Sequence, residues 1–493
     1  MAIRVTRRSL LTIVTAALAR RSARAQASLP ASADVVIVGG DPAALAAAFR
    51  LSGVDGLRVV LVDETPAWLP RPAGPPSSVA DLRPFVRGHQ RCFDSWHEAG
   101  NPGWAFSDVL PSFRRLERYE AGGGEFRGDR GPIAVAHCWD PHALHRAFLL
   151  GAVAAGFQQD ARHDFNRPRS QGVAGYHQKT HTDLGPQSFA DALLAPAVAA
   201  GAMVVRGAVV SRVVLERGRA VGVELLHEGA RKVLRADRAV LVAAAPVRAA
   251  QILQLSGVGP ADVLRAAGVA VVADLPGVGR NLHAQVRLPV RWRATDAAFA
   301  LAPSTVTAGM FTVSLSASPP DLQMDLVDPR AASGPWTGID VTLVQPVSRG
   351  VVRVRSTDPN AAPEIDTPTL TDAADVRALV QGVRLARLVM EGTALDRQRT
   401  VERDDTRGAS SQGALEALVR AAARETSDTA RTCAPGPPGE RAAVVDARLA
   451  VHGLAGLYVA GTAVMPSVVN APPDAAALMT GDRAADGVSS GRA

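Results

Sequence analysis

The chain has 493 residues, of which 47% are hydrophobic and 20% charged, a composition typical of a globular protein with a large core. Six of its 54 basic residues are arginines within residues 1–25, where no acidic residue occurs, so 48 basic residues stand against 47 acidic ones in the rest of the chain. The formal charge of +7 therefore gives no support to a nucleic-acid partner. Three cysteines exclude a disulfide-dense scaffold.

Residues 1–27 have the pattern of an export signal. Arg7 and Arg8 precede a short apolar run over residues 9–19, and small residues at 23–27 offer cleavage sites of the Ala-x-Ala type. The run is too short to span a hydrocarbon core of ~30 Å. The arginine pair resembles the twin-arginine signal of proteins exported after folding, and an ordinary secretory signal is the alternative. With either signal we expect a periplasmic or secreted protein whose mature chain has no integral membrane segment.

The first predicted unit after this segment is a strand, a glycine turn, a helix and a second strand. An apolar strand ends at Gly39 and Gly40, an Ala-rich helix is expected over residues 42–51, and a second apolar strand over residues 58–62 ends at Asp63. This spacing is typical of a dinucleotide-binding βαβ unit, in which the glycine turn and the helix N-terminus meet a pyrophosphate group.

Helices and strands alternate along the rest of the chain. We expect loops over residues 65–84 and 433–440, helices over 110–120, 141–155, 246–255, 372–390 and 475–485, and strands over 204–215, 220–226, 240–245, 351–355 and 457–461. This order indicates an α/β fold with a mainly parallel sheet.

Several sequence blocks together resemble the glucose–methanol–choline (GMC) oxidoreductases, which are FAD-dependent alcohol dehydrogenases and oxidases. The blocks are Val-Arg-Gly-His at 86–89, Gly-Asn-Pro-Gly-Trp at 100–104, Leu-Ser-Gly-Val-Gly-Pro at 255–260, Gly-Val-Gly-Arg-Asn-Leu at 277–282 and Val-Met-Pro at 464–466. They follow the family's order, and the resemblance spans residues 33 to 487. It implies an FAD/NAD(P)-binding Rossmann-like domain interleaved with an α+β substrate domain built from an antiparallel sheet and helices.

The resemblance also implies domain boundaries. Residues 33–285 are expected to form mainly the FAD-binding domain, with pieces of the substrate domain inserted at about 85–190. Residues 286–440 form the substrate or cap domain, and residues 441–487 return to the FAD-binding domain.

FAD is the cofactor that the resemblance implies. The candidate cofactor-binding residues are Gly39, Gly40, Ala44, Asp63, Ser77, Ser78, Val210, Ala245, Gly461 and Met465. Among them, Asp63 fits the family's ribose-binding acid and Val210 fits its adenine-side valine. The cysteines have no metal-ligand spacing, so no metal is expected.

The phosphate turn departs from the G-x-G-x-x-G pattern at its second glycine. Asp41, which has the same sign of charge as a phosphate, stands there, and Pro42 follows it. An Asp ahead of a Pro at the first helical position is a favourable N-cap. We therefore interpret Asp41 as the cap of a helix that satisfies its own N-terminus and leaves no place for a phosphate.

The catalytic positions also depart from the family, whose members use a histidine to take the hydroxyl proton, with a second histidine or an asparagine beside it, while hydride passes to the flavin. Aligned on the blocks around Thr432 and Met465, these positions are Asp428 and Asp474. Two anionic groups beside a flavin oppose hydride transfer to it unless one of them stays protonated. Other candidates for a base are His177, His181 and His283.

Three functions are open on this sequence. The first is an exported FAD-dependent oxidoreductase acting on the CH–OH group of an alcohol or sugar, with an electron acceptor or a partner subunit as its further partner. The second is a catalytically inactive protein of the same fold, a pseudoenzyme that acts as a binding or assembly subunit. The third is non-redox chemistry, such as a lyase or hydrolase reaction that uses the two aspartates.

Overall fold

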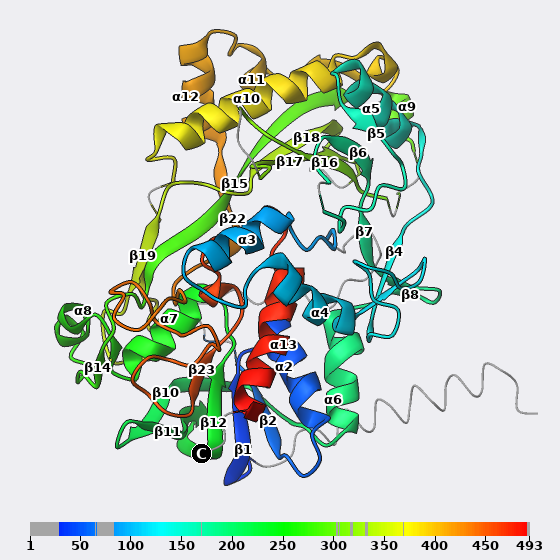
Figure 1. Ribbon diagram of the computed structural model, residues 1–493. Helices are drawn as coiled ribbons and strands as arrows, with labels where there is room; N and C mark the ends of the chain where they lie inside the picture. The colour runs from blue at the N-terminus through cyan, green and yellow to red at the C-terminus, as the bar shows by residue number, and fades with distance from the viewer. Residues whose placement is uncertain are drawn as a thin grey trace, which may run out of the picture.

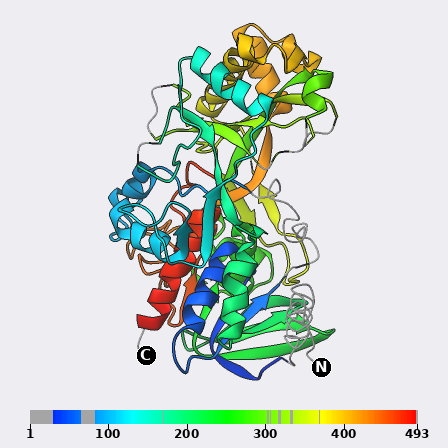
Figure 2. The same ribbon diagram turned by 90° about the vertical axis from the view of Figure 1, so that its right-hand side faces the viewer.

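The computed structural model of the protein describes residues 29–64, 66, 83–168, 170–301, 304, 306–315, 319–330, 334–367 and 369–490. The predicted export segment and the candidate residues Ser77 and Ser78 lie outside the described residues. The described part is built on two large sheets, one above the other in Figure 1, and Figure 2 shows the same arrangement from the side. Within that part, no helix combines the length and the hydropathy needed to cross a bilayer.

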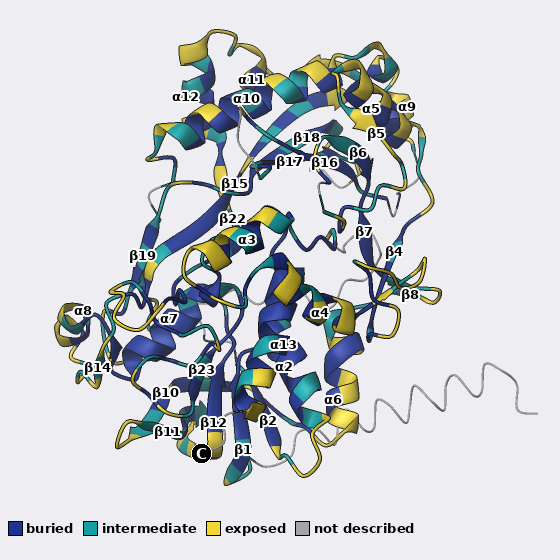
Figure 3. Ribbon diagram, viewed as in Figure 1, coloured by how far each residue is buried: buried dark blue, intermediate teal, exposed yellow. Residues whose placement is uncertain are grey.

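The first sheet has a parallel centre. Its order is β10-β11-β12-β1-β2-β9, with β23 beside β12. The strands are β1 (Ser32–Val38), β2 (Val59–Asp63), β9 (Met203–Arg206), β10 (Ala208–Glu216), β11 (Arg219–His227), β12 (Ala230–Val242) and β23 (Leu457–Val459). Strands β23, β12, β1, β2 and β9 are parallel neighbours, whereas β10, β11 and β12 form an antiparallel meander. Figure 3 shows the parallel strands buried, which explains why β1 and β2 are apolar along most of their length.

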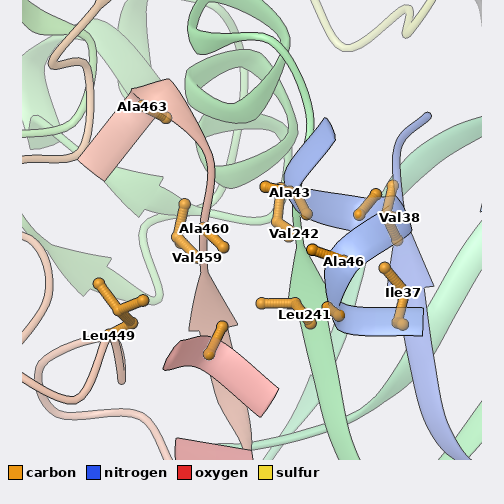
Figure 4. Packing of buried hydrophobic residues seen from close by; sticks show 14 of the residues in the cluster. Ile37, Val38, Ala43, Ala46, Leu241, Val242, Leu449, Val459, Ala460 and Ala463 are labelled. Atoms are coloured by element: carbon orange, nitrogen blue, oxygen red, sulfur yellow. The ribbon is translucent and has the colours of Figure 1, made fainter. Parts of the chain in front are cut away.

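Two helices from opposite ends of the chain pack together on this sheet. Helix α2 (Pro42–Ser52) follows β1, and α13 (Asp474–Ser490) closes the described chain. A Cβ atom added to Gly481 of α13 would lie 2.1 Å from the backbone oxygen of Ala43 in α2, so the two helices touch through their backbones. Figure 4 shows apolar side chains of β1, α2, β12 and β23 gathered in one buried cluster. This packing fixes the turn between β1 and α2.

The second sheet is largely antiparallel and has its own core. Its order is β20-β19-β15-β18-β17-β16-β6-β5, and β21 and β22 also pair with β15. The strands are β5 (Gln158–Gln159), β6 (Val173–Tyr176), β15 (Arg280–Ala294), β16 (Ala308–Thr312), β17 (Leu322–Val327), β18 (Trp336–Leu343), β19 (Gly350–Arg353), β20 (Glu364–Asp366), β21 (Arg399–Glu402) and β22 (Arg424–Ala430). The helices α5 (Ala143–Ala154), α10 (Ala373–Met390) and α12 (Gln412–Ala422) contribute to the apolar cluster on one face.

Shorter elements connect and flank the two sheets. The helices are α3 (Gln90–Glu98), α4 (Phe106–Leu116), α6 (Ala195–Ala199), α7 (Pro246–Leu255), α8 (Ala261–Ala266), α9 (Asp296–Phe299) and α11 (Asp404–Arg407), with a π-helical turn at Ala190–Leu194 and 3-10 turns at Thr393–Leu395 and Thr462–Val464. A four-stranded sheet contains β3 (Glu117–Tyr119), β4 (Ile133–His137), β7 (Gln178–Thr182) and β8 (Gly185–Pro186), and β13 (Val258–Gly259) pairs with β14 (Ala273–Asp274). In Figure 1, α3 lies between the second sheet and α13.

The predicted fold class, a Rossmann-like domain combined with an α+β part, is confirmed. The predicted helix over residues 246–255 coincides with α7. The helix expected over residues 110–120 instead ends at Leu116, because Glu117–Tyr119 form β3 and pair with β4. The first sheet takes its strands from residues 32–63, 203–242 and 457–459, and the second from 158–176 and 280–430. The predicted domain boundaries stay a prediction.

Candidate active site

The turn between β1 and α2 requires glycine at position 39 and passes close to the Asp63 side chain at position 40. Gly39 has φ of +127°, and a Cβ atom there would lie 1.9 Å from the backbone oxygen of Ala243 at the end of β12. A Cβ atom on Gly40 would lie 2.6 Å from the Oδ1 atom of Asp63 at the end of β2. Ala44, in the first turn of α2, is fully buried. The turn therefore lies closely between the carboxyl ends of β2 and β12, where doubly wound sheets bind their ligands.

Asp41 occupies the N-cap position of α2, but its side chain does not cap the helix. Its backbone is extended, with φ of −70° and ψ of 163°, Pro42 follows it, and its carboxylate makes no capping hydrogen bond. The interpretation that this helix satisfies its own N-terminus through Asp41 is therefore wrong. Burial raises the pKa of Asp41 to about 7, and the charges of Asp474 and Glu64 add to the effect. The carboxyl group therefore keeps its proton to a higher pH than an exposed aspartate does.

Three further candidate residues lie at the ends of β12 and β23. Ala245 is the N-cap of α7, and Met465 is fully buried at the end of a 3-10 turn. Gly461 has φ of +91°, and a Cβ atom on it would lie 3.6 Å from the Cβ atom of Ala43. A backbone with positive φ favours glycine at this position. The structure therefore brings Gly461 beside the phosphate turn, at the same edge of the first sheet.

Asp63 and Val210, the predicted ribose and adenine residues, differ in their surroundings. Asp63 is partly exposed, and its Oδ2 atom lies 3.3 Å from the Nε atom of Arg206. Val210 lies on β10, and two charged side chains occupy its backbone groups. Its N–H donates to Glu64 Oε2 at 2.6 Å, and Arg248 Nη2 donates to its carbonyl oxygen. The sequence analysis did not identify Glu64 or Arg248. An arginine within an otherwise apolar helix, which needs a partner for its charge when buried, is the signal that could have found them.

Asp428 and Asp474 come together around an arginine from a third segment. Asp428 lies on β22, and Asp474 is the first residue of α13. Arg83 Nη2 lies 2.6 Å from Asp428 Oδ2, and Arg83 Nη1 lies 3.4 Å from Asp474 Oδ2. The side chain of Asp428 is 9% exposed, that of Asp474 28% and that of Arg83 42%. The structure thus brings both acids into contact with one cation, Arg83.

The charges in this cluster shift the protonation of its members. Burial raises the pKa of Asp474, and Arg83 cancels only part of that effect while Asp428 adds to it. Burial by itself lowers the pKa of Arg83, but the charges of Asp474 and Asp428 outweigh it and raise that pKa above its usual value. The expected repulsion between two carboxylates and an electron-rich flavin is therefore reduced by one fixed positive charge and by a tendency of Asp474 to stay neutral.

The three candidate histidines occupy other positions. His177 is buried, and its Nε2 atom lies 2.9 Å from Asp325 Oδ1 on β17. His283 lies on β15 opposite Ala430 of β22, and burial together with Arg349 and Arg431 lowers its pKa to about 2. His181 lies on β7. Within the described residues, no hydrogen bond or ion pair joins any of these three histidines to Arg83, Asp428 or Asp474.

One group of potential metal ligands lies apart from these residues. Within the described residues, His142, His145 and Asp328 place ligand atoms within 4.8 Å of one another. His142 Nε2 already lies 2.9 Å from Asp328 Oδ2, and the two imidazole rings stack at 4.0 Å. A hydrogen bond between His142 and Asp328 accounts for the closeness of these two groups. The expected absence of a metal stays a prediction.

A pocket of about 510 Å³ lies on the polar face of the second sheet. Its lining includes Arg287 and Arg291 of β15, Asp325 of β17 and Asp340 of β18. These side chains alternate along their strands with the apolar ones that pack under α10 and α12, as the two faces of a pleated sheet require. The lining of this pocket does not include Arg83, Asp428 or Asp474.

Comparisons with known proteins agree with this architecture. The chain is 31% identical over 435 residues to an oxygen-dependent choline dehydrogenase of Rhizobium johnstonii, covering 82% of this chain and 78% of the relative. It is also 31% identical over 445 residues to the mitochondrial choline dehydrogenase of Mus musculus, covering 83% and 74%.

Solved structures are similar in fold. Pyridoxine 4-oxidase from Mesorbium loti superimposes with a TM-score of 0.81 at 23% identity over 92% of this chain and 98% of that one. A formate oxidase of Aspergillus oryzae gives 0.81 at 19% identity, over 94% and 99%. Residues 76–287 match the N-terminal part, and residues 346–481 the C-terminal part, that define the GMC oxidoreductases. The chain, as its sequence blocks predict, belongs to the GMC oxidoreductase family.

Proposed function

We propose that this protein is an exported FAD-dependent oxidoreductase of the GMC type that oxidises the CH–OH group of a small alcohol or sugar. The observation that carries the proposal is the cluster of Asp428, Arg83 and Asp474, in which a carboxylate able to accept a proton lies against a cation. The choline dehydrogenases and the pyridoxine oxidase among its relatives support an alcohol as the substrate. Membership of the GMC family supports FAD as the cofactor. Two solved structures of similar fold, whose descriptions name FAD, agree with it.

The residues of the phosphate turn fit a flavin dinucleotide at its pyrophosphate. The first N–H groups of α2 have no side-chain cap, so they are free to donate to an anion at the helix N-terminus. Gly39 and Gly40 let the turn approach Ala243 and Asp63, whose oxygen atoms a Cβ atom would meet at 1.9 and 2.6 Å. Asp41 is the residue that opposes the fit, and its raised pKa of about 7 limits that opposition near neutral pH.

In the proposed reaction the alcohol loses a proton to the protein and a hydride to the cofactor. When bound, FAD supplies the two-electron acceptor. Asp428 takes the hydroxyl proton, and its burial keeps water from competing for the carboxylate. Arg83 faces the oxygen on which negative charge develops and stabilises that charge. Asp474, held nearer to its neutral form, limits the total negative charge of the site.

The first test is the visible absorption spectrum of protein isolated from its native compartment. We expect this spectrum to contain the absorption bands of a flavin. Oxidation of a panel of small alcohols is then followed with an artificial electron acceptor. We expect Asp428→Asn to lower kcat by about 100-fold or more, the size of a lost general base. Asp262→Asn, which alters an exposed acid on α8, serves as the matched control and keeps wild-type rates. Turnover that is unchanged in Asp428→Asn would remove this residue from the mechanism.

A catalytically inactive protein of the GMC fold that acts as a binding or assembly subunit is the second candidate. The hydrogen bond from Arg83 to Asp428 favours it, because that bond occupies a carboxylate oxygen that a base would need. Protein that carries no flavin, gains none on incubation with FAD and oxidises no alcohol in the panel would support this candidate over the first.

We further propose that residues 1–27 direct export and are then removed. The adjacent Arg7 and Arg8 and the short apolar run support a twin-arginine signal. Edman sequencing of the protein from the periplasm or the medium tests this, with a mature N-terminus near Gln26 or Ser28 as the expected result. Replacement of both arginines by lysine distinguishes the two export routes, because a general secretory signal tolerates lysine.

A further inference from the structure

The backbone of Val210 forms hydrogen bonds with side chains at one edge of the first sheet. Strand β10 is the outer strand of the first sheet, with β11 as its strand neighbour. Edge strands present N–H and C=O groups that need partners when they are buried. Val210 is fully buried, and its N–H donates to Glu64 Oε2 at 2.6 Å while its carbonyl oxygen accepts from Arg248 Nη2. Both of its backbone groups are therefore occupied.

Glu64 and Arg248 form a paired fork at this edge. Arg248 Nε donates to Glu64 Oε1 at 2.7 Å, and Arg248 Nη2 donates to Glu64 Oε2 at 2.8 Å. Each of the two side chains is 1% exposed. Arg248 Nη1 also donates to Gln251 Oε1 at 2.6 Å, and Gln251 Nε2 donates to the backbone oxygen of Ala361. The pair is thus bidentate, buried and held by a second layer of hydrogen bonds, which fixes its position.

The donor and acceptor that this pair offers to Val210 are those of an adenine edge. A guanidinium–carboxylate pair is planar and presents an N–H donor next to an oxygen acceptor. Adenine presents an amino donor next to a ring-nitrogen acceptor. One backbone N–H and one backbone C=O can bind either partner, but not both at once. Since Val210 stands at the adenine-side position, the pair and an adenine ring compete for the same two groups.

We propose that the Glu64–Arg248 pair takes the place of adenine at Val210, so that the adenylate half of FAD adds little to its affinity and the protein binds FMN about as tightly as FAD. The inference rests on the proposed function, because it assumes a flavin site at the edge of the first sheet. If an adenine ring displaced either Glu64 or Arg248 from Val210, the charge of the other residue would stay buried without a partner. The free-energy cost of that unpaired charge opposes displacement of the pair by adenine.

The affinities of wild-type protein for FAD and for FMN, measured by flavin fluorescence after removal of bound flavin, test the proposal. We expect the two dissociation constants to agree within about threefold. Glu64→Ala combined with Arg248→Ala opens the edge without leaving an unpaired charge, and FAD should then bind more tightly than FMN by about tenfold or more. Wild-type protein that binds FAD more than about tenfold tighter than FMN overturns the proposal.

A matched control separates this effect from the general loss of a buried ion pair. Arg387 of α10 and Glu402 of β21 form another, largely buried Arg–Glu pair, beside the second sheet, and their double alanine variant should keep the wild-type ratio of FAD to FMN affinity. An unchanged ratio in the Glu64/Arg248 double variant also overturns the proposal. If wild-type protein binds neither flavin, the proposed function fails. The Glu64→Ala/Arg248→Ala variant then tests the present inference separately: if it gains FAD binding, the pair does occupy the adenine position at Val210, and if it gains none, the inference is refuted.

Discussion

Replacing Asp41 by asparagine will change how the stability of this protein depends on pH. Asp41 makes no side-chain cap at α2, so asparagine removes its charge without removing a hydrogen bond. In the folded protein the pKa of Asp41 is raised to about 7 by burial first, and then by Asp474 and Glu64, whereas an exposed aspartate titrates near 3.9. The folded state therefore holds its proton over a pH range in which the unfolded state has released it.

The sign of the effect follows from this difference. Between the two pKa values the folded state binds more protons than the unfolded state, so the free energy of unfolding falls as pH rises and levels off above about pH 7. A shift from 3.8 to about 7 corresponds to at most about 4 kcal/mol. Asp41 is half-buried, and screening by solvent reduces this figure to about 1 to 3 kcal/mol between pH 5 and pH 8. Asp41→Asn removes that loss.

Urea unfolding at several pH values between 5 and 8, without added flavin, provides the measurement. The stability of Asp41→Asn relative to wild type should increase from pH 5 to pH 7 and then remain constant. Asp262→Asn, at an exposed first-turn position of α8, should show no such increase. A difference between Asp41→Asn and wild type that stays the same from pH 5 to pH 8 would refute the reasoning.

Three other substitutions test separate contacts. Arg83→Met leaves the carboxylates of Asp428 and Asp474 without their cation and should lower the free energy of unfolding by about 1 to 3 kcal/mol at pH 8. The loss should be smaller at pH 5, where protonation of a carboxylate relieves the repulsion, and thermal unfolding at both pH values checks this. Gly481→Ala places a Cβ atom 2.1 Å from the backbone of α2 and should cost about 2 kcal/mol or more in urea unfolding. Gly413→Ala in α12, with open space around it, should not destabilise the protein and should stabilise it by up to about 1 kcal/mol, because alanine has the higher helix propensity. Glu64→Gln leaves the charge of Arg248 buried and should cost about 3 to 5 kcal/mol, and a loss below 1 kcal/mol would contradict the buried pair.

The local elements could be predicted because their signals lie within a few residues. The apolar run before Gly39, the proline that begins α7 and the long periodic pattern of α10 each act over one strand or helix. Where a distant strand intervened, the prediction was wrong: residues after Leu116 leave the helix because β4 offers Glu117 and its neighbours a pairing partner. Backbone hydrogen bonds to another segment outweighed local helix propensity there.

The role of Asp41 could not be predicted from its neighbours. The N-cap position and the following Pro42 were identified correctly from the sequence, but the expected capping bond is missing from α2. The carboxyl group instead feels burial and the charges of Asp474 and Glu64, and Asp474 comes from the far end of the chain. An electrostatic environment is a sum over space, so residues far away in sequence contribute as strongly as adjacent ones.

The sequence by itself determined the family, the fold class, the glycine turn and the positions of the two candidate acids, because family blocks and short-range patterns are written along the chain. Only the tertiary structure decided what surrounds those positions. Arg83 and Asp428 are separated by 345 positions, and Glu64 and Arg248 by 184, yet each pair is in direct contact. Ion pairing requires side chains within about 4 Å, and the packing of two sheets and the segments between them, rather than local sequence, brings these charges to that distance.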